Sequence, residues 1–279
     1  MTILVTGATG QGTGNVGRHV FTELVRAGAA PRVLTRNPAA ANLPGGTDVV
    51  YGDLSKPDTL GPAFEGIERM YMMAINGDNV LDPETATSVF ETAKGAGIRR
   101  VVLLSASGTP LIEVEVPLEE SGLEWTHVRP GEYSANTVDL WASAIRGEGV
   151  VRGAFLDVIG VPIHEADVAD VAVAALLEDG HTGQAYSLTG PEQLTQRQQV
   201  RAIGAAIGRD LRTEDLTWEA ARRGMQEEGW PEDIINHLFG YYTTWADDPP
   251  EVLPTVRDIT GRPGRSFAQW ATEHTADFA

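Results

Sequence analysis

The sequence begins with a short apolar run, Ile3–Thr6, that passes directly into the glycine-rich turn Thr6-Gly7-Ala8-Thr9-Gly10. An amphipathic helix is predicted to follow over Val16–Arg26, and Gly28 would end it. A glycine-rich turn between a strand and a helix lets backbone N–H groups approach a pyrophosphate, which the helix N-terminus then stabilises. Glycines also mark ordinary turns, but this placement favours nucleotide binding. The segment therefore predicts the first strand and helix of a dinucleotide-binding fold.

The rest of the first half continues the alternation of short apolar runs with helical patterns. Further strands are predicted at Arg32–Thr35, Asp48–Tyr51, Arg69–Met73, Arg100–Leu104 and Trp125–Arg129. Helices are predicted around Thr85–Ala96 and over Val114–Glu120. The apolar runs show little polar alternation, as expected for strands that are covered on both faces. The pattern predicts an α/β fold with a Rossmann-type, doubly wound parallel sheet.

The pattern loosens after Pro130, which predicts two parts. Residues 1–130 are expected to form the dinucleotide-binding Rossmann core. Residues 131–279 are expected to form a smaller, mainly helical part on the substrate side, interleaved with the core and without its own linker. Its predicted elements are a helix capped by Asp167, a strand at Ala185–Leu188, a helix over Thr195–Gly208, two helices between Thr217 and Trp245 separated at Pro231, and a last helix near Ser266–Glu273.

Charge and composition exclude several classes of function. The 39 acidic residues outnumber the 21 basic ones, and the net charge is −18. A surface that binds nucleic acid or anionic membrane needs clustered positive charge, so neither is an expected partner. The chain has no cysteine, which excludes disulfides and thiolate chemistry. No apolar stretch approaches the ~18–20 residues of a membrane span, and the N-terminus lacks the basic region of a signal peptide, so we expect a cytoplasmic protein.

The residues that follow the second and third predicted strands indicate which cofactor is bound. Arg36 stands where a Rossmann fold selects its nucleotide, and a guanidinium suits the 2′-phosphate of NADP(H). The alternative is a solvated arginine after a strand. Asp53 and Leu54 follow the third strand, where a carboxylate can accept a hydrogen bond from the adenine amino group. Asp53 as the cap of the next turn is an equally good interpretation.

Polar residues also follow the fifth and sixth predicted strands. Ser105 and Ser107 come after the fifth, and Tyr133 and Asn136 come after the sixth. Open α/β sheets bind ligands at the carboxyl ends of their strands, so these side chains are candidates to line the nicotinamide and the substrate. Roles as turn residues for the serines and in packing for Tyr133 remain open alternatives.

Several segments together resemble a known family. They are Val5-Thr6-Gly7-Ala8-Thr9-Gly10, Arg36, Gly52-Asp53-Leu54, Val102-Leu103-Leu104-Ser105 and Ser121-Gly122-Leu123-Glu124-Trp125-Thr126-His127-Val128-Arg129-Pro130-Gly131. In this order and spacing the chain resembles the NmrA-like atypical short-chain dehydrogenase/reductases. Within them it is most similar to NAD(P)H-binding reductases related to the quinone oxidoreductases and the ergot-alkaloid reductases. The segments Gly190-Pro191-Glu192 and Gly261–Phe267 also fit, so the resemblance covers nearly the whole chain.

The resemblance implies an NADP(H) cofactor and a set of residues to hold it. These residues are Gly7, Thr9, Gly10, Gln11, Val16, Arg36, Asp53, Leu54, Ala74 and Ser105. The chain departs from the family in the phosphate loop, where Gln11-Gly12-Thr13-Gly14 is an insertion between Gly10 and Asn15.

The chain also departs from the family's usual proton relay, Tyr-x-x-x-Lys, in which the lysine lowers the tyrosine pKa. None of the six tyrosines has a lysine four residues later. The lysine that related reductases place near position 111 is replaced by leucine. The conventional relay is therefore absent.

Tyr133 and His164 are the remaining catalytic candidates, although the residue pattern favours a structural or solvent-facing histidine at His164 over a proton donor. No metal is expected, because no group of His, Asp and Glu has the spacing of a metal site. Glu113, Glu115, Glu119 and Glu120 are expected to form a solvated helix face.

These observations favour an NADPH-dependent reductase that transfers hydride to a small conjugated or aromatic carbonyl, quinone or imine. The expected partner is a small-molecule substrate, and a homodimer is a further possibility. Two alternatives stay open: a regulatory protein that senses NADP(H) without turnover, and a non-redox isomerase or cyclase on the same fold.

Overall fold

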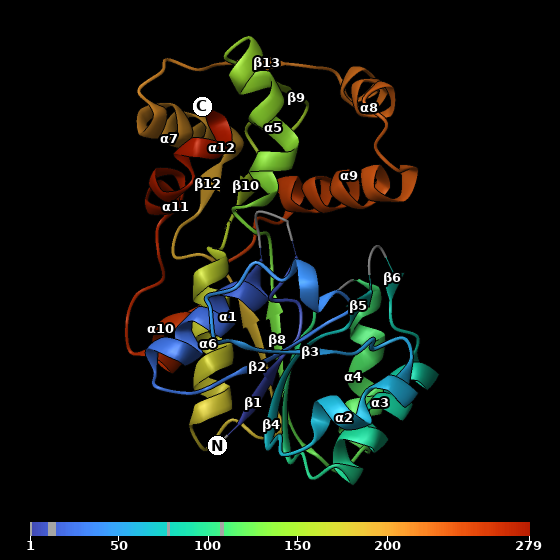
Figure 1. Ribbon diagram of the computed structural model, residues 1–279. Coiled ribbons are helices and arrows are strands. Elements are labelled where there is room, and N and C mark those ends of the chain that lie inside the picture. Colours follow the sequence, from blue (N-terminus) through green and yellow to red (C-terminus); the bar gives the residue numbers. More distant parts are fainter. Residues whose placement is uncertain (1, 11–14, 77–78, 107–108) are drawn as a thin grey trace. The chain divides into compact units, whose positions relative to one another are not determined.

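The computed structural model describes residues 2–10, 15–76, 79–106 and 109–279, and it divides the chain into two compact units (Figure 1). The first unit contains residues 1–131, 165–188 and 255–263. The second contains residues 132–164, 189–254 and 264–279. The chain therefore leaves the first unit after Gly131 and returns to it twice.

A seven-stranded parallel sheet forms the centre of the first unit. In sheet order its strands are β11 (Gln184–Leu188), β8 (Glu124–Pro130), β7 (Arg100–Leu104), β4 (Arg69–Met73), β1 (Ile3–Val5), β2 (Arg32–Thr35) and β3 (Asp48–Tyr51). Every residue of β1 and β7 is buried, because helices cover both faces of the sheet. The strand order reverses between β1 and β4, which is the place where such sheets bind ligands. The predicted Rossmann-type α/β fold is confirmed.

Helices pack on both faces of this sheet (Figure 1). One face carries α1 (Val16–Arg26), α6 (Glu165–Leu177) and α10 (Thr255–Thr260). The other face carries α2 (Gly61–Phe64), α3 (Pro83–Gly95) and α4 (Glu115–Glu120), whose buried residues include Phe64, Phe90 and Leu118. Shorter elements of this unit are the 3₁₀ turns η1 (Pro38–Ala40), η2 (Pro57–Thr59) and η3 (Pro110–Val114) and the small hairpin of β5 (Ile75–Asn76) with β6 (Asn79–Val80).

The second unit is mainly helical and has its own core. Its helices are α5 (Asn136–Gly147), α7 (Gln196–Ile207), α8 (Trp218–Glu227), α9 (Glu232–Asp247), α11 (Phe267–Glu273) and α12 (Thr275–Phe278). Its strands pair as β9 (Val150–Gly153) with β13 (Arg212–Asp215) and β10 (Ile159–Gly160) with β12 (Leu194–Thr195). Large side chains such as Trp141, Phe267 and Trp270 fill the core.

Side-chain caps begin two of these helices where the sequence predicted helices to start. The Thr195 hydroxyl accepts from the Gln198 backbone N–H, and the Gln198 side chain accepts in return from the Thr195 N–H. Ser266 and Gln269 form the same capping box at the start of α11. Such caps depend on local residues alone, which is why the sequence located them.

Two expectations about secondary structure need correction. Asp167 does not cap its helix, because α6 begins two residues earlier at Glu165. Asp167 is instead buried in the first turn, 3.6 Å from the Arg262 guanidinium, so tertiary pairing explains the aspartate. The predicted helix over Val114–Glu120 is confirmed as α4 (Glu115–Glu120), which follows the 3₁₀ turn η3. The loosely patterned stretch after Pro130 contains α5, a helix of twelve residues that the sequence did not reveal.

Among the described residues, no helix is both long and apolar enough to span a membrane.

Candidate functional site

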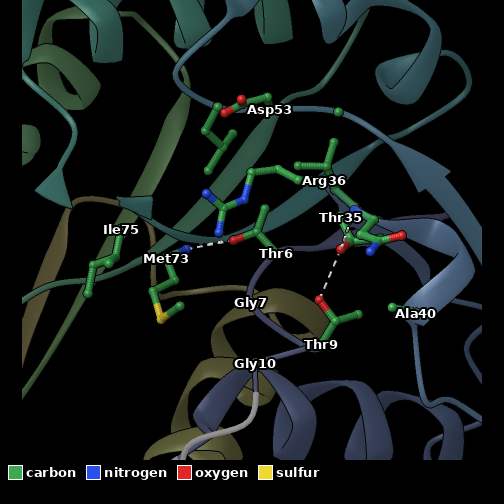
Figure 2. Close-up of a pocket in the computed structure, with 14 residues that line it drawn as sticks. Thr6, Gly7, Thr9, Gly10, Thr35, Arg36, Ala40, Asp53, Met73 and Ile75 are labelled. Carbon is green, nitrogen blue, oxygen red and sulfur yellow. Dashed lines mark hydrogen bonds between the residues drawn. The ribbon is translucent and has the colours of Figure 1, made fainter. Parts of the chain in front are cut away.

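A cavity of about 420 Å³ opens in the first unit where β1, β2, β3 and β4 end. Figure 2 shows that it is bounded by the glycine turn on one side and by Arg36 and Asp53 on the other. Its lining residues are Thr6, Gly7, Thr9, Gly10, Leu34, Thr35, Arg36, Asn37, Ala40, Gly52, Asp53, Leu54, Met73 and Ile75. We call it the first-unit cavity. Its place at the carboxyl ends of parallel strands is the place where Rossmann folds bind nucleotides.

The glycine turn owes its shape to close backbone packing against α1. Gly7 has a φ of +74°, a conformation that residues with a Cβ rarely adopt. A Cβ on Gly17 would stand 2.7 Å from the Gly7 carbonyl carbon and 2.7 Å from the Thr6 carbonyl oxygen. The turn therefore lies directly on the first turn of α1, where backbone N–H groups and the helix dipole favour an anion.

Hydrogen bonds from neighbouring strands hold the turn in place (Figure 2). The Met73 backbone N–H donates to the Thr6 hydroxyl over 2.8 Å, which joins the end of β1 to the end of β4. The hydroxyls of Thr9 and Thr35 are 3.0 Å apart, which joins the turn to the end of β2. Contacts within the protein therefore hold the floor of the cavity in place.

Arg36 and Asp53 stand at the side of the cavity opposite the glycine turn. Arg36 is exposed, and its side chain extends over the cavity in Figure 2. The Asp53 carboxylate accepts from the Ser55 backbone N–H over 3.0 Å and from the Ser55 hydroxyl over 2.7 Å. Lys56 Nζ lies 3.9 Å from its other oxygen. Asp53 therefore stabilises the following turn and lines the cavity at once, so the two sequence interpretations do not exclude each other.

Six of the ten residues expected to hold the cofactor line this cavity: Gly7, Thr9, Gly10, Arg36, Asp53 and Leu54. Val16 is buried at the start of α1, and Ala74 is buried between the lining residues Met73 and Ile75. Gln11, with the rest of the inserted segment 11–14, and Ser107 lie outside the described residues.

Sequence reasoning missed several lining residues, among them Leu34, Asn37, Gly52 and Met73. Each lies at or just beside the end of a strand. The predicted strand ends could therefore have identified these residues as candidates to line the cavity.

Ser105 belongs to a buried polar cluster instead of the cavity wall. It is 1% exposed at the end of β7, next to the Glu115 carboxylate. Arg129 donates to both oxygens of Glu115, over 2.8 Å to Oε1. Burial opposes ionisation of Glu115, but the hydrogen bonds from Arg129 outweigh it and lower the pKa of Glu115. The expectation that Glu115 belongs to a solvated helix face is wrong, because Glu115 is 3% exposed and pairs with Arg129 on the strand β8.

The same cluster corrects the expectation about metal spacing. In the described part of the chain, ligand atoms of Glu115, Glu119 and His127 lie within 4.8 Å of one another. Both Glu115 oxygens bind Arg129, and His127 Nε2 is 3.1 Å from Glu119 Oε1. The His127 ring is stacked on Trp125, and burial lowers its pKa. The group is therefore a salt-bridged polar core in which protein partners already use these oxygens.

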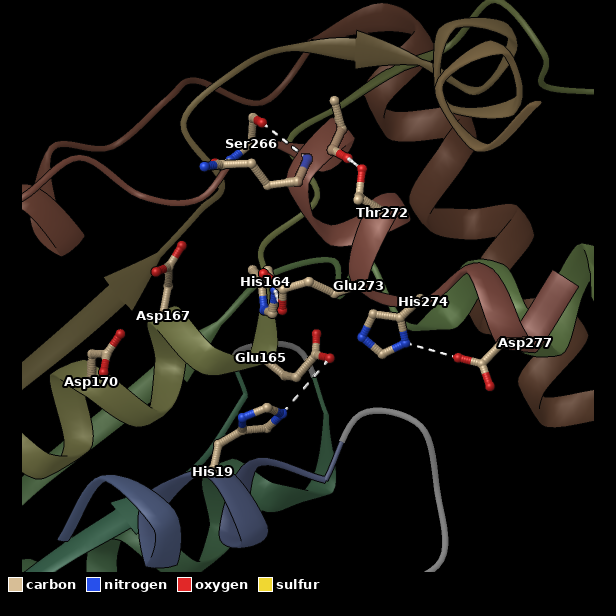
Figure 3. A network of polar contacts seen from close by, with 12 residues as sticks. His19, His164, Glu165, Asp167, Asp170, Ser266, Thr272, Glu273, His274 and Asp277 are labelled. Carbon is tan, nitrogen blue, oxygen red and sulfur yellow. Dashed lines mark hydrogen bonds and ion pairs between the residues drawn. The ribbon is translucent and has the colours of Figure 1, made fainter. Parts of the chain in front are cut away.

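The two catalytic candidates, Tyr133 and His164, both belong to the second unit. Tyr133 forms a single parallel bridge with Ile163, which places it one residue from His164 on the paired segment. His164 is 1% exposed, and its Nε2 lies 3.3 Å from Glu273 Oε2. Figure 3 shows the neighbouring His274 bonded to Asp277, with 2.8 Å between Nδ1 and Oδ2. His164 therefore sits in a polar cluster with an acidic partner.

Comparison with known proteins identifies the family. A model of NAD(P)H-binding proteins matches residues 12–115. The chain is 35% identical to a (4-alkanoyl-5-oxo-2,5-dihydrofuran-3-yl)methyl phosphate reductase of Streptomyces griseus, and the match covers 99% of both chains. The chain belongs to the NAD(P)H-dependent reductase family. An NAD(P)H azoreductase of Xenophilus azovorans is 33% identical, again over 99% of both chains.

A solved structure of an NADPH-dependent quinone oxidoreductase from Escherichia coli has the same fold. It superimposes with a TM-score of 0.79 at 25% identity and covers 98% of this chain and 99% of its own. The resemblance to NAD(P)H-binding reductases that the sequence motifs indicated is confirmed.

The first-unit cavity fits the cofactor of this family. The absent Cβ at Gly17 lets the glycine turn pack directly on the start of α1, and backbone N–H groups at such a helix start bind phosphate groups. Leu34 and Leu54 supply apolar wall at the end where Arg36 and Asp53 supply charged groups. The residues present therefore match a dinucleotide from its phosphates to its adenosine end.

Proposed function

We propose that this protein is an NADPH-dependent reductase that reduces a small conjugated or aromatic acceptor, such as a quinone, an azo compound or an imine. The observation that carries the proposal is the first-unit cavity, which combines a glycine turn on a helix N-terminus with an arginine at the end of β2. The family relatives support it, because one is named as a reductase of a (4-alkanoyl-5-oxo-2,5-dihydrofuran-3-yl)methyl phosphate and another as an NAD(P)H azoreductase.

The residues of the cavity would hold the cofactor by separate contacts. The backbone of Gly7–Gly10 and the start of α1 would bind the pyrophosphate. Arg36 would bind the 2′-phosphate of NADPH through paired N–H donors, which supports a preference for NADPH over NADH. Asp53 and Leu54 would contact the adenine. The bound nicotinamide would supply the hydride, and the protein would supply orientation and the exclusion of water.

The nature of the acceptor is argued from the missing proton relay. The chain has two lysines, and both are engaged elsewhere: Lys56 pairs with Asp53, and Lys94 donates to the Ser121 carbonyl over 2.7 Å. Neither stands four residues after a tyrosine, as the usual relay requires. A quinone or azo group stabilises the negative charge that hydride addition creates, so it needs less help from a general acid than a simple ketone does. The proposal therefore favours conjugated acceptors.

Steady-state oxidation of NADPH, followed at 340 nm, tests this function. We expect turnover with a small quinone such as menadione or with a simple azo dye, and little with an unconjugated ketone of similar size. NADPH binding measured in parallel by calorimetry separates the outcomes. Turnover of the unconjugated ketone at an equal rate would contradict the argument about the acceptor, and absence of NADPH binding would contradict the proposal itself.

The missing relay is also the observation that favours a second candidate, a regulatory protein that senses NADP(H). Such a protein would bind NADPH tightly without oxidising it in the presence of any tested acceptor. The same two measurements distinguish it from the reductase.

A further inference from the structure

A second cavity, of about 280 Å³, lies entirely within the second unit. Residues of α5, β9, α8 and α9 form its walls, and the start of α7 contributes Gln196. Protein interiors rarely leave voids larger than a water molecule, so a cavity of this size, open to solvent, is a candidate binding site. We call it the second-unit cavity.

Aromatic side chains dominate one wall of this cavity. Phe155, Phe239 and Tyr242 line it, with ring centroids 5.1 Å apart for Phe155 and Phe239 and 5.4 Å for Phe155 and Tyr242. Trp141 of α5 lines it as well. Edge-to-face packing among these rings holds the wall in a defined shape. A wall of rings of this kind contacts flat, apolar molecules well.

The cavity has one polar end, formed by Gln196 and the Tyr242 hydroxyl. The Tyr242 hydroxyl is hydrogen-bonded to the Gln196 side chain and to the Glu132 carboxyl group behind it. Glu132 Oε2 is buried and has no hydrogen-bond partner among the described residues. It occupies space that exists only because residue 160 is glycine, since a Cβ there would collide with Oε2. The polar end thus consists of the side chains of Glu132, Tyr242 and Gln196. Of these, Tyr242 and Gln196 line the cavity.

The charges around the cavity argue against an anionic ligand. Arg152 lines it, but its guanidinium donates to Glu148 and to Glu214, each over 2.8 Å. Glu228 also lines the cavity and accepts from Trp230 Nε1 over 3.2 Å. A phosphate or carboxylate would have to compete for an arginine that already has two carboxylate partners. The lining therefore favours a neutral molecule.

We propose that the second-unit cavity binds an uncharged, planar aromatic molecule of one or two rings, with the rings against Phe155 and Phe239 and a polar atom at Tyr242 and Gln196. Its volume lies just below the ~300–1,000 Å³ of pockets that hold drug-sized ligands, which sets the size of the molecule. This site is independent of the first-unit cavity, and its occupation does not require that the protein reduce anything.

The same substitution at two helical glycines, one lining the cavity and one outside it, tests whether the ligand binds in the second-unit cavity. Gly224 lines the cavity, and a Cβ built on it meets no atom within 4 Å, so Gly224→Leu places a side chain at the cavity without a clash. Gly240 on the adjacent helix α9 is exposed, also has no atom within 4 Å and does not line the cavity. Gly240→Leu is therefore the control for the same substitution in a helix.

Binding of 2-naphthol, which is uncharged at pH 7, is to be measured by calorimetry for the wild type and for both variants. We expect Gly224→Leu to weaken it at least tenfold and Gly240→Leu to change it less than twofold. Tyr242→Phe, which keeps the ring and removes the hydroxyl, should also weaken it about tenfold. NADPH affinity and the melting temperature, measured on the same samples, should stay unchanged for Gly224→Leu and so show that the loss is local.

Three results would overturn the proposal. The first is equal binding of 2-naphthol by wild type and Gly224→Leu, and the second is no detectable binding by the wild type. The third is tighter binding of 2-naphthyl phosphate than of 2-naphthol, which would show that the site selects an anion. None of these results depends on reductase activity, so a failure of the proposed function would be seen separately in the NADPH oxidation assay.

Discussion

Gly17 approaches Gly7 so closely that a Cβ on residue 17 would stand 2.7 Å from the Gly7 carbonyl carbon. This contact between the start of α1 and the glycine turn sets the shape of the first-unit cavity. Because the crowding atoms belong to the backbone, a side chain at residue 17 cannot be accommodated by a rotamer change.

Gly17→Ala should therefore push α1 away from the turn. We expect the free energy of unfolding to fall by about 1–3 kcal/mol, the usual cost of overpacking, and NADPH to bind more weakly. Chemical denaturation and calorimetry measure the two effects. Gly61→Ala in α2, where a Cβ meets no atom within 4 Å, is the control and should lower neither quantity. An alanine at position 17 that leaves both quantities unchanged would contradict the packing argument.

Arg36→Asp should reduce NADPH affinity more than NADH affinity, because only NADPH carries the 2′-phosphate. Loss of a charge-assisted hydrogen-bonded pair costs about 1.5–3 kcal/mol, which corresponds to a ~10–150-fold weaker Kd. Titration of wild type and variant with both nucleotides measures it. Arg201→Asp, an exposed site on α7, makes the same change of charge and should have little effect. Equal affinity of the wild type for NADPH and NADH would remove the basis for the assignment.

Tyr133→Phe tests whether a tyrosine supplies an essential proton. Tyr133 lacks the lysine four residues later that activates the tyrosine in the usual relay, so we expect kcat to fall by much less than the ~100-fold typical of losing a general acid. Steady-state kinetics with a quinone acceptor measures the change. Complete loss of turnover in a variant with an unchanged melting temperature would show that Tyr133 acts without its usual partner.

Glu132 should make stability depend on pH. Burial raises its pKa from 4.5 to about 7, so the folded protein binds a proton that the unfolded chain releases. The stabilisation that this protonated group gives is fully present below the unfolded pKa and is lost as the pH rises through the folded pKa. At about 1.4 kcal/mol for each pKa unit, the loss between pH 4.5 and pH 7 is about 3 kcal/mol.

Glu132→Gln keeps a hydrogen-bonding group in place and abolishes this titration. Compared with the wild type, the variant should gain about 3 kcal/mol in relative stability between pH 5 and pH 8. Urea denaturation at both pH values measures the difference. Glu120→Gln, at an exposed site, should show no such gain. A constant difference between wild type and Glu132→Gln at the two pH values would exclude a buried, protonated carboxyl.

Arg129→Met should leave the Glu115 carboxylate buried without its partner. Breaking a buried ion pair from one side costs about 3–5 kcal/mol. The double variant Glu115→Leu/Arg129→Met removes both charges and should recover most of the loss, whereas two independent single effects would add. Unfolding free energies of the two single variants and the double variant complete the cycle.

The first unit was largely predictable because its determinants are local. Predicted and observed boundaries coincide for α1, β2, β3, β4 and β7. Strands that are covered on both faces must be apolar along their length. A glycine turn must follow the first strand so that the first helix can pack closely on the turn. The glycine turn, Arg36 and Asp53 could be recognised as cavity residues because each directly follows a strand end.

The helix α5 was missed, and Asp167 was misread as a cap, because the second half lacks such regular apolar runs. The Glu115 carboxylate was predicted to be solvated because acidic residues surround it in the sequence. Its partner Arg129 is on β8 and is brought close only by the fold. Sequence spacing carries no information about a partner that only the fold brings near.

The sequence by itself determined the fold class, the strands of the nucleotide-binding half and the residues that follow them, because hydrophobic periodicity and glycine placement act over a few residues. Only the tertiary structure decided that residues 165–188 and 255–263 return to the first unit. It also decided that Glu132 is buried behind Tyr242 and that α5, α8 and α9 enclose a second cavity. These features depend on side chains that are distant in sequence, and their burial follows from packing free energies that no local pattern records.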